Sequence, residues 1–433
     1  MERPLQEKIA TRSLRAGVIG LGYVGLPLAI TFAEAGFHVT GIDVDQQKVD
    51  AANRGESYIP DISSSTLQTL LDRKRIDFTS DYAVLKEIDA VSICVPTPLR
   101  KTRDPDISYI ISVTQQVRAH LHHGQLIVLE STTYPGTTDE VLLPELESTG
   151  LNVGVDFFLA FSPERIDPGN RDFDTHNTPK IVGGITPACT ELAQAFYGAA
   201  IEKVVAVSST RVAEMVKLLE NTFRAVNIGL VNEIAIICEK LSIDVWEVID
   251  AAATKPFGFM RFLPGPGLGG HCIPVDPHYL SWKLKTLDYT ARFIELAAEI
   301  NGSMPHYVVN KIGEALNEQQ RSFNGSTVLV LGVAYKRNVG DVRESPALDI
   351  ISQLLARKAI VLYNDEYIPS LTLHSVTLYS QPVSTGLLEA ADCVVIVTDH
   401  SYYDVLWIIR KAHCIVDTRN MTQGHNDEKI FRL

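Results

Sequence analysis

The sequence predicts an α/β protein in which two doubly wound parallel-sheet domains are joined by a helical middle domain with a long central helix. Apolar runs typical of buried strands alternate with amphipathic segments near both ends of the chain, whereas the middle keeps a helical period for about thirty residues. The 433 residues also exceed what one hydrophobic core supports. We therefore expect three domains, 1–205, 206–318 and 319–433.

The first domain opens with an apolar strand at 14–19, followed by the glycine turn GLGYVG and a helical segment that ends at Gly36. A second strand follows at 38–45. Further strand-like runs, separated by amphipathic segments, extend the sheet; they are 90–96, 126–132, 157–164 and 180–184.

The middle domain begins where the period changes at Ser209, and the helical pattern continues to Leu241. Its apolar stripe comprises Val212, Met215, Val216, Leu219, Phe223, Val226 and Leu230. Such a helix is roughly 45 Å long, which suits either a spine between domains or a seam between two copies of the chain. A second long helix is expected near 290–317.

The third domain restarts the alternation of strands and amphipathic segments. Its expected strands lie within 326–336, 359–366, 391–400 and 413–420.

The overall charge limits the function. A formal net charge of -13 argues against nucleic-acid binding, so positive partners for an anionic ligand must be local. The six cysteines are far apart and lack CxxC spacing, as in a protein of the reducing cytoplasm, and no cluster has metal-ligand spacing. The uncharged stretch 16–33 is interrupted by five glycines or prolines, which favours a strand, turn and buried helix over a membrane span.

Gly20, Gly22 and Gly25 form a GxGxxG motif between a predicted strand and a predicted helix. Asp43 ends the next strand, where a carboxylate can accept both ribose hydroxyls and would repel a 2′-phosphate. This series predicts a Rossmann-like domain that binds NAD rather than NADP. Lys48 either reaches the ribose or phosphates or is a solvated helix lysine.

Lys217 and Asn221 are four residues apart on the predicted central helix and therefore share a face. A buried lysine beside an amide suits an oxyanion or an alcohol that loses its proton. The alternative is that both are surface polar residues.

Cys272 follows a loop with four glycines among the eight preceding residues, and Asp276 lies four residues later. Glycines permit close backbone approach to a ligand, and a thiol beside a nicotinamide can hold an aldehyde covalently on its way to an acid. Asp276 would poise a base or orient Lys217. His271 is adjacent in sequence, but neighbours on an extended loop point apart, so we assign it no role.

Two strand ends add polar groups where open α/β sheets bind ligands. Glu164 and Arg165 follow the strand at 157–164, and Thr132 follows the strand at 126–132. Thr132 either contacts water or nicotinamide or caps a helix.

Several motifs in one order resemble the UDP-glucose/GDP-mannose dehydrogenase family over nearly the whole chain. They are GVIGLGYVGLPLA, ESTTYPGTT, SPERIDPGN, KLLEN, GPGLGGHCIPVDP and GVAYKRNVGDVRESPA. Family members oxidise the C6 hydroxyl of a nucleotide sugar to a carboxylate with two NAD. The resemblance implies an NAD-binding first domain, a central dimerisation and catalytic domain, and a UDP-sugar-binding third domain.

Carried onto this sequence, the resemblance makes Cys272 the nucleophile that forms a thiohemiacetal and then a thioester. Lys217 and Asn221 would stabilise oxyanions, while Asp276, Glu164 and a water held by Thr132 would assist proton transfer and hydrolysis. The implied cofactor-binding residues are Gly20, Gly22, Tyr23, Val24, Gly25, Asp43, Lys48, Thr97, Thr132 and Arg343. The implied substrate-binding residues are Glu164, Arg165, Lys217, Asn221, Phe262, Gly265, Gly269 and Lys336.

One departure bears on specificity. Enzymes of the family that act on UDP-glucose typically have a second glutamate four residues after the first in the PE motif, and this sequence has Pro168 there. SPERIDPGN instead resembles the branch that acts on UDP-N-acetylhexosamines, and UDP-N-acetylglucosamine is the favoured substrate. UDP-N-acetylmannosamine and UDP-glucose remain alternatives, and a shorter pocket at Pro168 would leave room for an acetamido group.

Two other functions are weighed against this one. A two-electron dehydrogenase of the β-hydroxyacid type has no use for Cys272 or for a third domain. A silent nucleotide-sugar-binding protein would be expected to lose its nucleophile, which is present here. The family resemblance further implies a homo-oligomer, a dimer or a multiple of dimers, that acts in polysaccharide biosynthesis. The cysteine pattern, the net charge and the interrupted apolar stretch predict a cytoplasmic protein without nucleic-acid or membrane partners.

Overall fold

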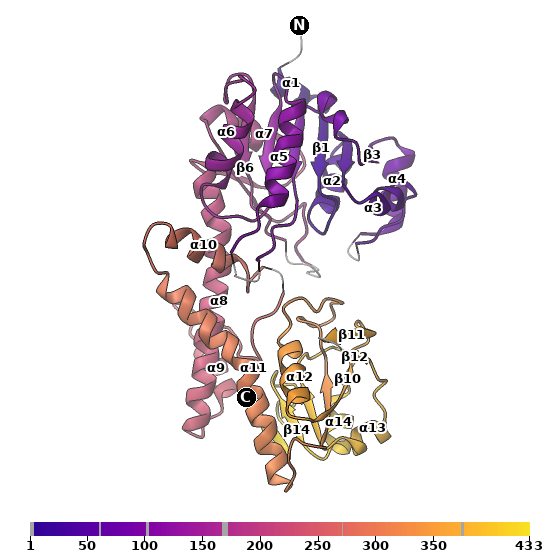
Figure 1. Cartoon of the computed structure of the whole chain (residues 1–433), viewed down its shortest axis with the longest axis vertical. Coiled ribbons are helices and arrows are strands. Elements are labelled where there is room, and N and C mark those ends of the chain that lie inside the picture. The colour runs from indigo at the N-terminus through magenta and orange to yellow at the C-terminus, as the bar shows by residue number, and fades with distance from the viewer. Residues whose placement is uncertain (1–3, 60–61, 101–103, 167–171, 271, 374–375) are drawn as a thin grey trace. The chain divides into compact units, whose positions relative to one another are not determined.

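A computed structural model describes residues 4–59, 62–100, 104–166, 172–270, 272–373 and 376–433. The chain divides into two compact units (Figure 1). The first unit comprises Met1–Glu220 and His278–Tyr289, and the second comprises Asn221–Pro277 and Thr290–Leu433. Each unit is built around one large sheet, so the predicted fold class, two Rossmann-like domains with a helical middle, is confirmed.

The sheet of the first unit has the strand order β3-β2-β1-β4-β5-β6-β7-β8. The strands from β3 to β6 are parallel and have the order of a dinucleotide-binding fold. Their bounds are β1 Arg15–Ile19, β2 His38–Ile42, β3 Ile76–Thr79, β4 Ala90–Ile93, β5 Leu126–Leu129, β6 Phe158–Phe161, β7 Lys180–Gly184 and β8 Val204–Ala206.

Strand β7 departs from the predicted parallel sheet, because it pairs antiparallel with β6 and parallel with β8. No helix is described between Phe161 and Lys180. A crossover helix is the usual way to bring the next strand back in parallel, and the described part of this connection contains none.

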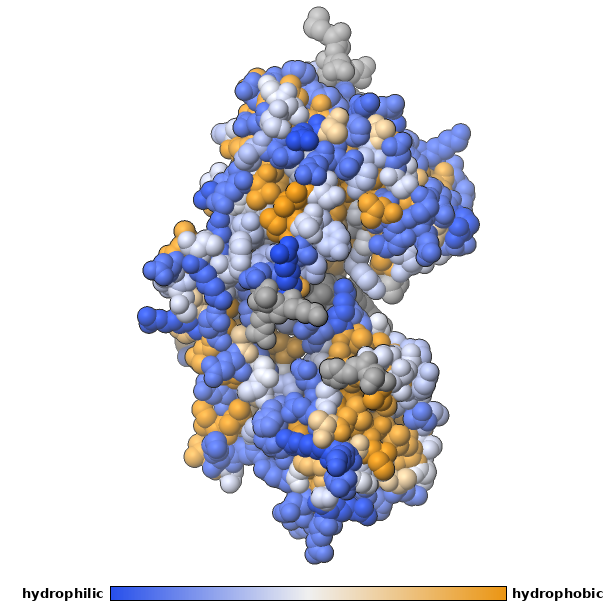
Figure 2. Space-filling view, in the orientation of Figure 1, coloured by the Kyte–Doolittle hydropathy of each residue, from blue (hydrophilic) through white to orange (hydrophobic). Residues whose placement is uncertain are grey.

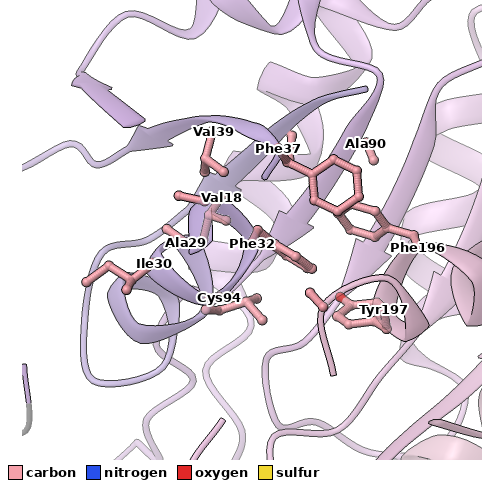
Figure 3. Close-up of a cluster of buried hydrophobic side chains, with 14 of the residues drawn as sticks. Val18, Ala29, Ile30, Phe32, Phe37, Val39, Ala90, Cys94, Phe196 and Tyr197 are labelled. Carbon is pink, nitrogen blue, oxygen red and sulfur yellow. The ribbon is translucent and has the colours of Figure 1, made fainter. Parts of the chain in front are cut away.

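Helices cover both faces of this sheet. They are α1 Leu5–Ala10, α2 Gly25–Glu34, α3 Gln46–Asn53, α4 Ser64–Asp72, α5 Ser108–His120, α6 Leu143–Glu147 and α7 Pro187–Gly198, with a 3-10 turn at Tyr82–Glu87 and a π turn at Thr138–Leu142. Successive side chains of a strand point to opposite faces, so Val18 joins the core under α2 and α7 whereas Ile19 joins the core under α5. Phe32, Phe37 and Phe196 pack together in the former core (Figure 3).

The predicted long helices are present as α8 (Thr210–Lys240) and α11 (Arg292–Glu318), with α9 (Val245–Ala253) and α10 (Asp276–Lys285) between them (Figure 1). The apolar stripe of α8 is largely exposed within the single chain, since Leu219 is 59% and Leu230 is 52% exposed. The stripe is therefore not part of the hydrophobic core of this chain. None of the described helices is long and apolar enough to cross a membrane.

The sheet of the second unit has five parallel strands in the order β10-β9-β13-β14-β15. Their bounds are β9 Thr327–Leu331, β10 Ile360–Asn364, β13 Cys393–Ile396, β14 Ile415–Asp417 and β15 Ile430–Arg432. The strand order reverses between β9 and β13, and open α/β sheets bind ligands outside the strand ends at such a switch point. A hairpin of β11 (Ser370–Leu373) and β12 (Val376–Tyr379) and the helices α12 (Pro346–Ala356), α13 (Thr385–Ala390) and α14 (Val405–Lys411) complete this unit.

Candidate active site

The GLGYVG turn of the first unit leaves space for a ligand at one glycine and none at the other two. Gly20 has φ +91°, and a Cβ there would lie 2.6 Å from the Cys94 carbonyl oxygen. A Cβ on Gly25 would lie 1.8 Å from the Gly20 carbonyl oxygen, whereas a Cβ on Gly22 would meet nothing within 4 Å. Gly22 thus borders open space beside the start of α2, where a dinucleotide pyrophosphate fits.

Asp43 ends β2 and holds this turn through its carboxylate. Its Oδ2 accepts the Leu21 backbone N–H at 2.8 Å, and its Oδ1 accepts the Asp45 N–H at 2.9 Å. Lys48 Nζ lies 3.6 Å from Asp43 Oδ2, so Lys48 forms an ion pair with this carboxylate. Of the other expected cofactor residues in this unit, Tyr23 is exposed, Val24 is half-buried and the Thr97 carbonyl oxygen accepts the Tyr279 hydroxyl.

A buried ionic cluster lies at the ends of β5, β6 and β7. Lys180 Nζ is 2.5 Å from Glu130 Oε2 and 3.2 Å from Glu164 Oε2, and all three side chains are buried. The Tyr197 hydroxyl donates to the other oxygen of Glu130. Lys180 and Glu130 were not among the predicted site residues; the available signal was a lysine at the start of the otherwise apolar strand KIVGG.

The two carboxyls of this cluster are shifted in opposite directions. Burial raises the pKa of Glu130, and the charge of Lys180 offsets that effect only in part. Burial would also raise the pKa of Glu164, but the charges of Lys180 and Lys217 and two backbone N–H groups outweigh it, so that pKa lies below its usual value. Glu164 is therefore held as a carboxylate and Lys180 as an ammonium.

The segment that follows β6 is fixed to α8 by Lys217 and Arg165. Lys217 Nζ donates to the Glu164 carbonyl oxygen at 2.5 Å, and Arg165 pairs in a bidentate manner with Glu220 at 2.6 and 3.2 Å. Arg165 also donates to the Pro179 carbonyl oxygen. The structure therefore places the predicted substrate residue Arg165 in an ion pair with α8. Pro168 lies outside the described residues.

Thr132 is half-buried and caps no helix, because the π turn at Thr138–Leu142 has Thr137 at its N-cap. Glu214 of α8 fixes the loop after Thr132 by hydrogen bonds. Its carboxylate accepts the Gly136 N–H at 2.6 Å, the Thr138 N–H at 2.9 Å and the Thr138 hydroxyl at 2.7 Å. Burial raises the pKa of Glu214 to about 7. Sequence reasoning missed this residue because one acid in a helical run gives no sign of burial.

In the second unit, Asn221 and Asp276 are brought together. Asn221 Nδ2 donates to Asp276 Oδ2 at 2.5 Å, and both side chains are buried. Lys217 is also buried, so the reading of Lys217 and Asn221 as surface residues is wrong. The Cys272 carbonyl oxygen accepts the N–H groups of Val275 and Asp276, a tight turn that sets Cys272 just before α10. Cys272 is half-buried, and His271 lies outside the described residues.

The glycine loop before Cys272 packs closely against the third predicted domain. A Cβ on Gly269 would lie 2.7 Å from Tyr335 Cβ, and a Cβ on Gly265 would lie 2.8 Å from the Arg419 guanidinium. The Gly270 N–H donates to the Arg343 carbonyl oxygen, which ties the loop to the segment that contains Lys336. Only residues without a side chain allow this approach, which is why the loop is rich in glycine.

The remaining expected residues of the second unit have structural partners as well. Phe262 packs edge-on against Phe223, and the Arg343 guanidinium pairs with Asp341. Lys336 is half-buried on the segment after β9. Arg419 is a cation that sequence reasoning missed, and its guanidinium packs against Gly265.

The fold and these residues define a class of protein: an oxidoreductase with a dinucleotide-binding unit, a second parallel-sheet unit and a cysteine on a glycine-rich loop. The chain belongs to the UDP-glucose/GDP-mannose dehydrogenase family. The family's NAD-binding domain matches residues 14–201, its central domain 211–303 and its UDP-binding domain 329–424. The predicted family and cofactor are confirmed, and the chain is an NAD-dependent nucleotide-sugar dehydrogenase.

Similar proteins differ in the sugar that their names give. The chain is 33% identical to UDP-N-acetyl-D-glucosamine 6-dehydrogenase of Pseudomonas aeruginosa, over 90% of this chain and 92% of that one. It is 34% identical to NDP-N-acetyl-D-galactosaminuronic acid dehydrogenase of Ralstonia nicotianae, over 93% and 95%. The solved UDP-N-acetyl-D-mannosamine dehydrogenase of Pyrococcus horikoshii has a TM-score of 0.88 at 34% identity, with 97% and 98% of the two chains covered.

Proposed function

We propose that this protein oxidises the C6 hydroxyl of a UDP-N-acetylhexosamine, with UDP-N-acetylglucosamine as its preferred substrate, to the corresponding uronic acid. The observation that carries the choice of an N-acetylated sugar is that the similar proteins described above are all named for N-acetylhexosamine derivatives. The SPERIDPGN motif supports the same choice. Which epimer the enzyme prefers, at C2 or at C4 of the sugar, is decided by comparing the oxidation rates of the UDP-N-acetylhexosamines.

The cofactor site is the GLGYVG turn with Asp43. Gly22 admits the pyrophosphate and Asp43 accepts the ribose hydroxyls, while Lys48 pairs with the Asp43 carboxylate. NAD, when bound, accepts one hydride in each of two oxidation steps. Thr132 and Arg343 are further contacts in this proposal.

Cys272 is the nucleophile of the proposed reaction. After the first oxidation, its sulfur adds to the C6 aldehyde carbon and gives a thiohemiacetal, whose oxidation leaves a thioester. Water then breaks the C–S bond, releasing the carboxylate and the thiol. The overall change is alcohol, two NAD and water to carboxylate, two NADH and three protons.

Charged and amide groups around the reacting carbon move protons and stabilise oxyanions in this proposal. Lys217 and Asn221 donate to the alkoxide and to the tetrahedral oxyanions. Asp276, oriented by Asn221, and Glu164, held ionised by Lys180, are the acceptors for the protons released. Thr132 positions the hydrolytic water. Lys336, the glycine loop, Phe262 and Arg165 form or support the nucleotide-sugar site.

The test is the NADH yield per mole of limiting UDP-N-acetylglucosamine. Wild type is expected to give two equivalents, and Cys272→Ser is expected to lose turnover sharply while still binding NAD. One equivalent from wild type would return the protein to two-electron chemistry. Rates for the UDP derivatives of N-acetylmannosamine, N-acetylgalactosamine and glucose measured alongside decide the sugar, and a much faster rate with UDP-glucose would overturn the proposal.

We further propose that two copies of the chain associate through the exposed stripe of α8, in the cytoplasm. Leu219, Phe223 and Leu230 are each exposed in the single chain, and Figure 2 shows apolar surface over the region of α8 and α9. Burying such a stripe is favourable at about 25 cal/mol per Å². Light scattering after gel filtration is expected to give a dimer or a multiple of it, and Leu230→Glu to weaken the association. A monomeric wild type would refute this proposal.

A further inference from the structure

His400 is a fully buried histidine of the second unit for which the proposed reaction has no role. It lies just beyond β13 and is 0% exposed. Its Nδ1 lies 2.9 Å from the Asn338 backbone nitrogen, and its Nε2 lies 3.0 Å from Asp365 Oδ2. Since a backbone N–H can only donate, Nδ1 is an acceptor, and the ring therefore has its proton on Nε2 and donates it to Asp365.

Asp365 holds the other end of the same segment. Its Oδ2 also accepts the Val333 N–H at 2.8 Å and the Ala334 N–H at 2.9 Å. The pair of Asp365 and His400 thus binds residues 333 and 334 at the start of the segment and Asn338 at its end. Both side chains are fully buried. The bonds of Asp365 to Val333 and Ala334 are buried, and the bond from Asn338 to His400 is partly buried.

The end at Asn338 has a second connection to the same loop. The Asn338 Oδ1 accepts the backbone N–H of Ser401 at 3.0 Å and its hydroxyl at 3.1 Å. Asn338 has φ +59°, a conformation that asparagine tolerates better than most residues. The segment therefore turns sharply at Asn338, and the loop after β13 determines where it turns.

Aromatic rings fix the orientation of the histidine. The Tyr402 ring stacks on His400 with an interplanar angle of 10° and a centroid distance of 5.3 Å. The ring centroids of Tyr367 and Tyr403 lie 5.1 and 5.9 Å from that of His400. A ring held in this way cannot rotate to exchange its two nitrogens. Its hydrogen bonds to Asp365 and Asn338 are consequently directional.

The segment held by this pair contains Lys336 and follows β9, whereas His400 follows β13. The strand order of this sheet reverses between β9 and β13, where a ligand is expected. We propose that His400 is a positioning residue for nucleotide-sugar binding: with Asp365 it fixes residues 333–338 so that Lys336 meets the diphosphate of the substrate. The inference rests on the proposed function, which assigns Lys336 to the nucleotide.

Two substitutions separate the functions of the two ring nitrogens. In His400→Asn the side-chain amide ends near the position of Nδ1, so an oxygen acceptor for the Asn338 N–H is retained. In His400→Gln the amide extends to the position of Nε2, so a donor to Asp365 is retained, but the Asn338 N–H loses its acceptor. His413→Asn, on an exposed histidine of the same unit, is the matched control.

The measurement is UDP binding by calorimetry, together with KM and kcat for UDP-N-acetylglucosamine. An unsatisfied N–H at Asn338 is expected to weaken UDP binding about tenfold in His400→Gln. KM should rise by a similar factor, with kcat and NAD affinity retained. His400→Asn should stay within about threefold of wild type, and His413→Asn should equal it. Equal UDP affinity in His400→Gln and wild type, or equal losses in both His400 variants, would overturn the inference.

A second variant covers the case in which neither His400 variant folds. Asn338→Ala leaves the buried ring untouched but removes the acceptor for Ser401 and places an alanine at positive φ. It is expected to raise KM for the nucleotide sugar and leave NAD affinity unchanged; an unchanged KM would contradict the role of this segment. If wild type binds NAD but not UDP, the proposed function itself fails, and the inference with it.

Discussion

Replacing Lys180 by methionine tests the buried cluster that holds Glu164 ionised. Methionine nearly fills the volume of the lysine stem but removes the charge that lies 2.5 Å from Glu130 and 3.2 Å from Glu164. At an effective dielectric constant of about 20, these two attractions amount to roughly 7 and 5 kcal/mol before desolvation is subtracted. Breaking a buried pair from one side leaves uncompensated charge and costs about 3–5 kcal/mol of unfolding free energy.

The assay is urea unfolding followed by the signal of the first unit, at pH 7. Lys203→Met is the control, since this lysine is exposed on the same unit, and its unfolding free energy should stay within about 0.5 kcal/mol of wild type. Lys180→Met/Glu130→Gln should recover part of the loss, because one of the two abandoned carboxylates is neutralised. A loss below about 1 kcal/mol in Lys180→Met would refute the reasoning that the cluster is tightly coupled.

The pH dependence of this variant has a defined sign. The pKa of Glu164 is depressed in the folded protein, so its contribution to stability is present above the unfolded value of 4.5 and is lost as the pH falls through the folded value. The difference between wild type and Lys180→Met should therefore narrow below pH 4.5. Without Lys180 the pKa of Glu164 rises, and the acid limb of the pH–rate profile should move to higher pH.

Two further substitution sets test the loops of the first unit. Gly22→Ala should keep its unfolding free energy within about 1 kcal/mol of wild type yet bind NAD at least about tenfold more weakly, because the added Cβ meets no protein atom but occupies ligand space. Gly25→Ala should lower the free energy of unfolding, because its Cβ would lie 1.8 Å from the Gly20 carbonyl oxygen. Calorimetric unfolding and NAD titration of both variants test these expectations. A destabilised Gly22→Ala together with a stable Gly25→Ala would contradict the proposed cofactor site. Because burial raises the pKa of Glu214 to about 7, the free energy of unfolding should fall as the pH rises from 4.5 through 7. Glu214→Gln should reduce that fall by up to about 3 kcal/mol. Unfolding at pH 5 and 8 measures it, with exposed Glu191→Gln as control, and equal slopes in both variants would refute the assignment.

Much of the site follows from local patterns in the chain. Gly20, Gly22, Gly25 and Asp43 lie within one strand–turn–helix–strand series, and the structure joins them through the hydrogen bond from Leu21 to Asp43. Asn221 and Asp276 come from separate motifs, and their contact needed the fold to bring them together. The role of Pro168 stays a prediction, because that residue lies outside the described part of the chain.

The sequence by itself determined the alternation of strands and helices, the dinucleotide turn and the cysteine loop, because each depends on residues that are close together in the chain. Only the tertiary structure decided which polar groups are buried together. Lys180 and Glu130 are 50 residues apart in the chain. The separation is 78 residues for Glu214 and Gly136, and it is 62 residues for His400 and Asn338. It also decided the reversed direction of β7 and the exposure of the α8 stripe. Periodicity records which face of an element is apolar, but not which neighbour covers that face or which charge compensates another.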